Sequence, residues 1–177
     1  MNASHVKAML RQTFQNKAVI IVPECSWTGY ECDMLVVHES LRVIDIEIKV
    51  SRADFKRDAA KDKWWHQHRW FIEGPQAPRQ WPPKVWKHYF AMPASIWKPD
   101  LEEFLPSPAC GVIVLHDKRQ QIVAEVVRRA TPNAAAEKID GRACVDLARL
   151  AGIRMWEALA QRQAANDAAV RSQEEAA

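Results

Sequence analysis

The stretch ECDMLVVHESLRVIDIEIKV, residues 31–50, decides the fold because it contains two alternating runs joined by a short turn. Alternation of apolar and polar residues is typical of strands with one buried face, and a turn around Ser40 predicts an antiparallel hairpin. If the hairpin is symmetric about Ser40, residues whose numbers add up to 80 lie opposite each other. Its apolar face then holds three cross-strand pairs, which are Cys32 with Ile48, Met34 with Ile46 and Val36 with Ile44.

The opposite face of this hairpin is charged. The same register sets Glu31 against Lys49 and Asp33 against Glu47, with Asp45 next along the strand. Directly opposed carboxylates destabilise a sheet unless something compensates them, and Mg²⁺ is a cation that prefers such hard oxygen ligands. A metal ion beside Lys49 would suit phosphodiester hydrolysis. The plainer alternative is an exposed face in which Glu31 and Lys49 form a surface ion pair of little energetic weight.

The flanking sequence predicts an α/β or α+β domain with a central mixed β-sheet flanked by helices. Apolar spacing near 3.6 indicates helices, and short alternating runs indicate strands. Residues 1–163 are expected to form a single domain and residues 164–177 a frayed or disordered tail. Besides the hairpin strands Glu31–His38 and Arg42–Val50, the expected elements are helices Ala3–Phe14, Ser51–Trp70 and Gly141–Gln163 and strands Ala18–Pro23, Lys87–Met92, Gly111–His116 and Gln121–Val127.

Composition narrows the class of protein only a little. The chain has 177 residues and a net charge of +3, which is compatible with a polyanionic partner. No apolar run approaches the length of a membrane span, and the N-terminus resembles an amphipathic helix rather than a leader, so we expect a cytoplasmic protein without a membrane partner. The cysteines contain no C-x-x-C pair and are expected to be reduced thiols, namely Cys25, Cys32, Cys110 and Cys144.

One continuous segment, from Glu31 to Trp64, has a more specific pattern. It reads ECDMLVVHESLRVIDIEIKVSRADFKRDAAKDKW, and its string IEIKVSRADF is the most distinctive part. The segment resembles the PD-(D/E)xK nuclease superfamily, in particular its MmcB-like DNA-repair and phage branch. HYFAMP (residues 88–93) and GVIVLHD (residues 111–117) are also similar to that branch.

The resemblance implies a restriction-endonuclease-like core and a metal-dependent nuclease that hydrolyses DNA. It implies Asp33 and Glu47 as ligands of Mg²⁺ or Mn²⁺, with the backbone carbonyl of Ile48 beside them and Lys49 as the catalytic lysine. Many members have a further Glu in the first helix, but residues 1–23 contain no acidic residue. Glu24 or Glu31 are candidates to replace it as auxiliary acids.

Basic and aromatic residues follow the hairpin. Arg52, Lys56, Lys63 and Arg69 are candidate DNA contacts, with Lys56 and Lys63 expected on one side of a helix. The alternative is a solvated helix face with local ion pairs. Tryptophans from Trp64 to Trp86 either stack on unpaired bases or fill the core.

The sequence therefore favours a DNA nuclease acting in repair, recombination or phage DNA processing. A catalytically inactive DNA-binding module of the same fold and an RNA nuclease stay open as alternatives, and so does a homodimer.

Overall fold

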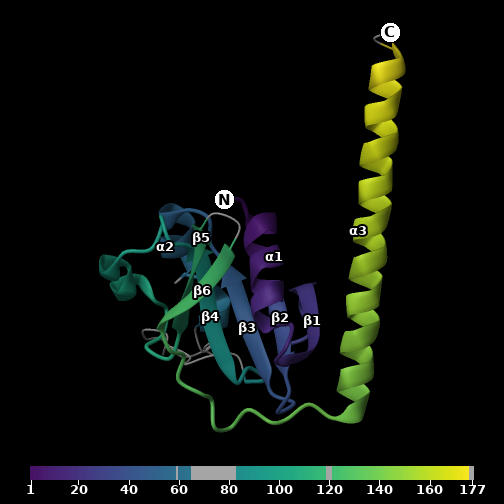
Figure 1. The fold of residues 1–177 in the computed structure, drawn as a ribbon. Helices are drawn as coiled ribbons and strands as arrows, with labels where there is room; N and C mark the ends of the chain where they lie inside the picture. Colours follow the sequence, from purple (N-terminus) through teal and green to yellow (C-terminus); the bar gives the residue numbers. More distant parts are fainter. Residues whose placement is uncertain (59, 65–82, 119–120, 176–177) are drawn as a thin grey trace, which may run out of the picture.

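The chain folds around a six-stranded sheet in a computed structural model that describes residues 1–58, 60–64, 83–118 and 121–175 (Figure 1). The strands lie side by side in chain order. The first three form an antiparallel meander, the third to fifth are parallel, and the sixth is antiparallel to the fifth. The elements are α1 (Ala3–Phe14), β1 (Ala18–Cys25), β2 (Cys32–His38), β3 (Val43–Ile48), α2 (Arg52–Asp58), η1 (Asp62–Trp64), β4 (Lys87–Pro93), η2 (Pro99–Phe104), β5 (Gly111–Lys118), β6 (Gln121–Arg128) and α3 (Gly141–Glu175).

This mixed sheet with flanking helices confirms the predicted α+β class. Each predicted strand is present, with its ends moved by a residue or two. The hairpin register is confirmed as well, because Met34 pairs with Ile46 and Val36 with Ile44. The third expected pair is wrong, because Cys32 and Ile48 pack in separate hydrophobic clusters.

One face of the sheet is covered by α1. The buried side chains of Val6, Met9 and Leu10 on this helix pack against alternate residues of β2 and β3, such as Met34 and Ile46. The spacing of these helix residues puts them on one side, as predicted, and Asn2 caps the helix by accepting from the backbone N–H of His5 at 2.9 Å.

The other face carries two separate apolar clusters. Leu35 and Val43 pack under the start of α3, whereas Phe90 and Val112 pack against α2 and η2. Strand β3 runs between the two clusters, and all of its residues are buried. The polar side chains that alternate along β3 are therefore enclosed from both sides.

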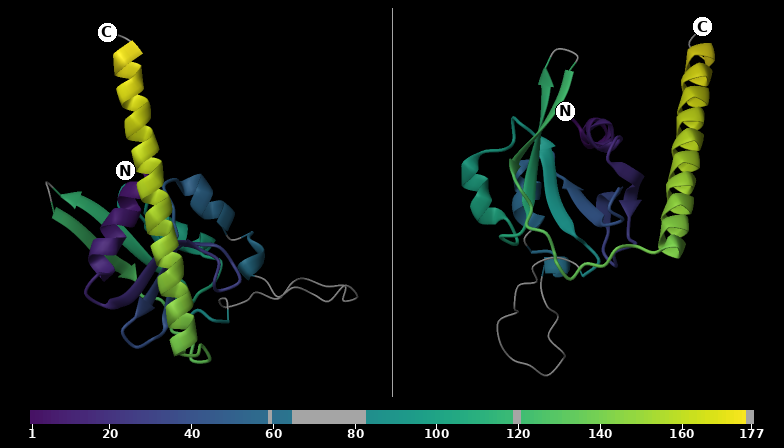
Figure 2. Two further views of the ribbon diagram at one scale, coloured as in Figure 1. Left: turned by 90° about the vertical axis from the view of Figure 1, so that its right-hand side faces the viewer. Right: turned by 60° about the horizontal axis from the view of Figure 1, so that its bottom comes forward.

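Two helices differ from the sequence prediction. The helix after the hairpin ends at Asp58 instead of continuing to Trp70, and a short 3₁₀ turn follows as η1. Helix α3 continues to Glu175, so the expected frayed tail from residue 164 is wrong. Its end projects well beyond the sheet (Figure 2).

The packing side of α3 also differs from the prediction. We expected Val145, Ala148, Met155 and Leu159 to face the core, but Val145 is 67% exposed. Leu147 is instead fully buried. Within the described residues, no helix is both long and apolar enough to cross a membrane.

Candidate active site at the end of strand β3

Asp33, Glu47 and Lys49 lie at one end of the β2–β3 hairpin. Glu47 lies on the same face of β3 as Asp45, and the Asp33 carboxylate reaches the peptide that follows Glu47 by accepting from the backbone N–H of Ile48. Lys49 follows directly after β3, and its backbone N–H donates to the carbonyl of Ala91 at 2.9 Å. The three residues of the predicted site are thus brought to the same end of the sheet.

The Glu47 carboxylate lies among three ammonium groups. Its Oε1 accepts from Lys63 Nζ at 2.5 Å, and its Oε2 accepts from Lys49 Nζ at 3.2 Å and Lys61 Nζ at 3.4 Å. Glu47, Lys49 and Lys63 are all buried, whereas the side chain of Lys61 is 49% exposed. Glu47 is therefore fully bonded, and among the described lysines that contact it Lys61 is the half-exposed one.

Asp58 holds the lysines from the end of α2. Its Oδ1 lies 2.6 Å from Lys49 Nζ and 2.7 Å from Lys61 Nζ, and its Oδ2 accepts from Trp64 Nε1 at 3.3 Å. Lys49 is consequently fixed between two carboxylates. From the sequence, a solvated helix face with local ion pairs was one alternative for this region, whereas Asp58 is buried and holds two lysines.

The two acids of the predicted site have opposite pKa shifts. Burial opposes ionisation of Glu47, but the ammonium groups of Lys63, Lys49 and Lys61 outweigh it and lower the pKa to about 2. Burial raises the pKa of Asp33, and the nearby charge of Glu47 adds to the rise. Glu47 is thus ionised at neutral pH, whereas the charge of Asp33 is incompletely compensated.

Asp33 lies at the edge of this cluster, toward α1. Its Oδ2 accepts from the backbone N–H of Ile48 at 2.7 Å. The hydrogen bond anchors the carboxylate beside the peptide between Glu47 and Lys49.

The two auxiliary acids have different surroundings. On β1, Pro23 pairs with Met34 and Cys25 pairs with Cys32. Glu24 stands between Pro23 and Cys25, so it lies next to Asp33. Its carboxylate forms an ion pair with Lys7 Nζ of α1 at 2.6 Å, and its φ of 49° is left-handed. Glu31 lies just before β2 and is exposed. Glu24 is therefore the better placed of the two.

A second buried pair lies deeper along the same face. Asp45 Oδ1 is 3.1 Å from His88 Nδ1, and both side chains are almost fully buried. The His88 ring meets the ring of Trp64 edge to face at a centroid distance of 4.7 Å. Sequence reasoning placed Asp45 on this face but did not find His88, which comes from the neighbouring parallel strand β4.

The carboxylates of this site are of the ligand type that Mg²⁺ prefers. The raised pKa of Asp33 shows that its negative charge is incompletely compensated, and Glu47 offers an ionised carboxylate near it. A cation would have to displace an ammonium group from Glu47 Oε2, and the half-exposed Lys61 can leave toward solvent. Among the described residues, no three His, Cys, Asp or Glu side chains gather as a ready-made metal cluster.

The four candidate DNA contacts have separate positions. Arg52 donates through Nε to the carbonyl of Ile96 at 2.9 Å, and Lys56 is exposed with Nζ 3.9 Å from the ring centroid of Phe104. Lys63 is 3% exposed, so the expectation that it lines a surface with Lys56 is wrong. Arg69 lies outside the described residues.

Of the clustered tryptophans, Trp64 belongs to the core. It is fully buried between α2 and β4, so it cannot stack on a base. Trp86 is half-buried, with the guanidinium of Arg42 and the ammonium of Lys87 over its ring. Trp65, Trp70 and Trp81 lie outside the described residues.

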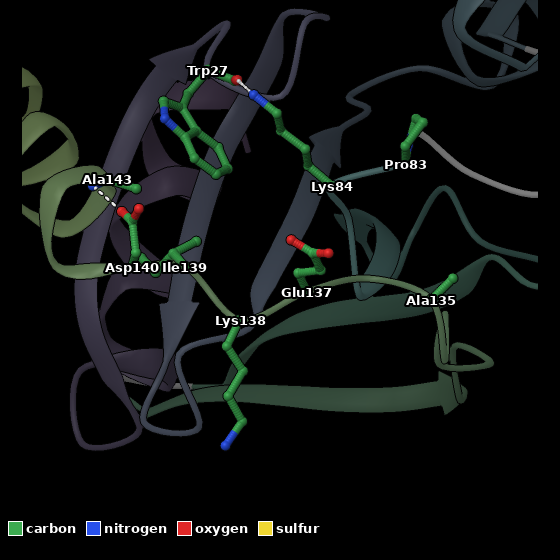
Figure 3. A pocket seen from close by; sticks show the side chains of 9 residues that line it. All are labelled: Trp27, Pro83, Lys84, Ala135, Glu137, Lys138, Ile139, Asp140 and Ala143. Atoms are coloured by element: carbon green, nitrogen blue, oxygen red, sulfur yellow. Dashed lines mark hydrogen bonds between the residues drawn. The ribbon is translucent and has the colours of Figure 1, made fainter.

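A cavity of about 470 Å³ lies away from this cluster, beside the segment that leads into α3 (Figure 3). In it Lys84 Nζ donates to the backbone carbonyl of Trp27 at 3.4 Å, and Asp140 caps α3 by accepting from the N–H of Ala143 at 2.7 Å. None of the residues that line it belongs to the predicted site.

Comparison with known proteins identifies the fold but no activity. No family model matches the chain, and no curated protein matches it. A solved structure of a protein of unknown function from Silicibacter pomeroyi is similar, with 19% sequence identity and a TM-score of 0.53. The match covers 87% of this chain and 86% of that chain. At this identity the likeness concerns the fold alone.

Proposed function

We propose that this chain is a magnesium-dependent nuclease of the PD-(D/E)xK kind that hydrolyses DNA in the cytoplasm, in repair, recombination or phage DNA processing. One observation carries the proposal. Asp33, Glu47 and Lys49 meet at one end of β3, with the Asp33 carboxylate bonded to the backbone N–H of Ile48 and the Lys49 ammonium fixed between the buried carboxylates of Glu47 and Asp58. Enclosed charges of this kind are costly to fold and are common at catalytic sites.

Each residue has a role in this proposal. Asp33, Glu47 and the carbonyl of Ile48 would hold the ion, which when bound polarises a phosphoryl oxygen and lowers the pKa of its water. Lys49 would contact the scissile phosphate and stabilise the charge that develops on it. Asp58 is a positioning residue, because it holds Lys49 at 2.6 Å and touches no substrate itself.

The exposed residues next to the site favour a polyanionic substrate. Lys61 lies at the open side of the cluster with a half-exposed ammonium group, and Lys56 is exposed on α2. Cationic side chains placed in this way hold a phosphate backbone without reading its sequence.

A DNA-binding module without catalysis is the second candidate. The observation that favours it is the complete bonding of Glu47, whose two oxygens already accept from three lysines. In such a module the lysines would replace the metal ion. An RNA nuclease is a third candidate, because the same metal chemistry acts on either backbone.

Cleavage of matched labelled strands tests the proposal. The wild-type chain should cut duplex or single-stranded DNA with Mg²⁺ or Mn²⁺ and stop when the metal is chelated. Lys49→Ala should lower the rate about 100-fold or more. Lys17→Ala is the matched control, because it also removes one ammonium group but lies exposed at the opposite end of the sheet.

The outcomes separate the three candidates. DNA binding without cleavage under any divalent metal supports the inactive module, and cleavage confined to RNA strands supports the RNA nuclease. Equal rates for Lys49→Ala and Lys17→Ala, with both variants folded by circular dichroism, would remove Lys49 from the chemistry.

A further inference from the structure

Helix α3 leaves the body of the protein about one third of the way along its length. Its first turns are docked by Leu147, and Arg154 makes a final contact through Nη2 to the carbonyl of Glu24 at 3.1 Å. Residues 155–174 are all exposed, and the helix continues into solvent (Figures 1 and 2). Its second half is therefore a helix with no partner among the described residues.

An apolar stripe runs along the exposed side of α3. Val145, Trp156, Leu159 and Val170 are 67%, 68%, 47% and 52% exposed. The number of residues between these positions is close to a whole number of helical turns, so they lie along one side of the helix. Gly152 lies on the same side. This side lies opposite Leu147, and an exposed Trp in such a stripe marks an interaction surface.

The apolar positions of the stripe are arranged nearly symmetrically about the middle of the helix. Val145 and Val170 lie at equal distances from the middle of the helix near residue 158, and so do Trp156 and Leu159. When two copies of such a helix run antiparallel about this point, Val145 meets Val170 and Trp156 meets Leu159 of the partner subunit. Ala160, next to Leu159, has a small side chain that leaves room for the indole of the partner subunit's Trp156.

Charges beside the stripe have the same arrangement with opposite signs. Arg142 and Arg149 lie in the first half of α3, and Asp167 and Glu174 lie at the corresponding places in the second half. Their spacings of 7, 18 and 7 residues, read from the sequence, put all four on one side of the helix. An antiparallel pair sets each arginine level with an acid, whereas a parallel pair sets like charges level with each other.

We propose that a second copy of this chain packs antiparallel along α3, through the stripe from Val145 to Val170, over about 40 Å. Trp156 of each subunit packs against Leu159 of the partner subunit at the centre. Arg149 forms an ion pair with Asp167 of the partner subunit on each side. Arg142, Arg149 and Glu174 take part in no ion pair within the described part of the chain, so their charges are available.

Sedimentation of the full chain at micromolar concentration tests the interface. The wild type should sediment as a dimer, and Trp156→Glu should sediment as a monomer. Ala165→Glu is the control, because it adds the same charge on the exposed helix but on the side away from the stripe, and it should stay dimeric. A monomeric wild type, or a dimer that Trp156→Glu leaves intact, would overturn the proposal.

The direction of pairing has its own test. Arg149→Glu and Asp167→Arg should each weaken the dimer, and the two together should restore it. Spin labels at Gln173→Cys, with the part-exposed Cys144 replaced by Ser, should lie roughly 45 Å apart in the antiparallel dimer and about 10 Å apart in a parallel one. The short distance, or a double variant weaker than both single ones, would contradict the antiparallel arrangement.

Discussion

Lys63 and Lys61 both contact Glu47, but they differ in exposure. Lys63 is 3% exposed and Lys61 is half-exposed. Loss of one partner from a buried ion pair leaves a charge that water cannot reach, whereas an exposed ion pair contributes little. The two lysines therefore form a pair of positions that differ strongly in burial, and Lys61 additionally contacts Asp58.

We expect Lys63→Met to lower the free energy of unfolding by about 3–5 kcal/mol and Lys61→Met by less than about 1 kcal/mol. Methionine keeps most of the aliphatic chain, so the difference reports the charge. Urea unfolding at pH 7 measures both values. Equal losses would mean that the cluster is not enclosed as described.

The low pKa of Glu47 gives a stability that depends on pH. Its value of about 2 in the folded chain lies below the ordinary value of 4.5. The folded state therefore binds the proton more weakly, and the stabilisation is present above pH 4.5 and lost as the pH falls toward 2. Glu47→Gln should be less stable than the wild type at pH 6, with the gap narrowing at pH 3 and closing as the pH approaches 2. A gap that is constant with pH would contradict this prediction.

Asp33 is expected to behave in the opposite way. Its raised pKa means that the folded chain binds the proton more tightly, so its favourable contribution is present below pH 3.8 and lost as the pH rises. Asparagine keeps an acceptor for the Ile48 N–H without the charge. Asp33→Asn should gain stability relative to the wild type between pH 3.5 and pH 7 in urea unfolding. A relative loss over this range would show that the charge is already compensated.

Among the elements, strands were predicted better than helix ends. The register of β2 and β3 could be read because Ile44, Ile46 and Ile48 of β3 alternate with polar residues, and a slip of one residue would turn every side chain to the other face. The end of α2 could not be predicted from the sequence, because the charged residues after Asp58 keep a helical spacing. Instead, the chain turns and brings Lys63 and Trp64 inward.

Helix α3 shows a second limit of pattern reading. Its most apolar side, which includes Val145 and Leu159, was expected to face the core, yet Leu147 on the other side is buried. Two apolar sides compete on this helix, and local spacing does not tell which one meets the sheet. In the same way, the contact of Asp45 with His88 depends on the pairing of β3 with β4, which is not local.

Strand β5 begins at a residue that only glycine can fill. A Cβ on Gly111 would lie 2.4 Å from Tyr89 Cε1 and 2.7 Å from the backbone nitrogen of Ala130. Gly111→Ala should therefore destabilise the chain by about 1–3 kcal/mol. Gly141→Ala at the start of α3 meets nothing within 4 Å and should not destabilise it. Thermal unfolding compares the two, and a tolerant Gly111→Ala would mean that Tyr89 moves freely.

On the scale of the whole molecule, the sheet combines near and distant pairings. β2 and β3 pair Val36 with Ile44, whereas β3 and β4 pair Ile44 with Lys87, across 43 positions of the chain (44 to 87). The strands of the meander are joined by short loops. The parallel pairing of β3 with β4, which also forms the Asp45–His88 contact, requires the ends of a long chain segment to come together first.

This arrangement sets an order of assembly. The meander of the first three strands is expected to be formed in the transition state of folding, and β4 is expected to join the sheet afterwards. In stopped-flow urea experiments, Val36→Ala should then mainly slow refolding and Met92→Ala should mainly speed unfolding, since both side chains are fully buried. The opposite pattern would mean that the long crossover closes early, before the hairpin that carries Asp33 and Glu47 has formed.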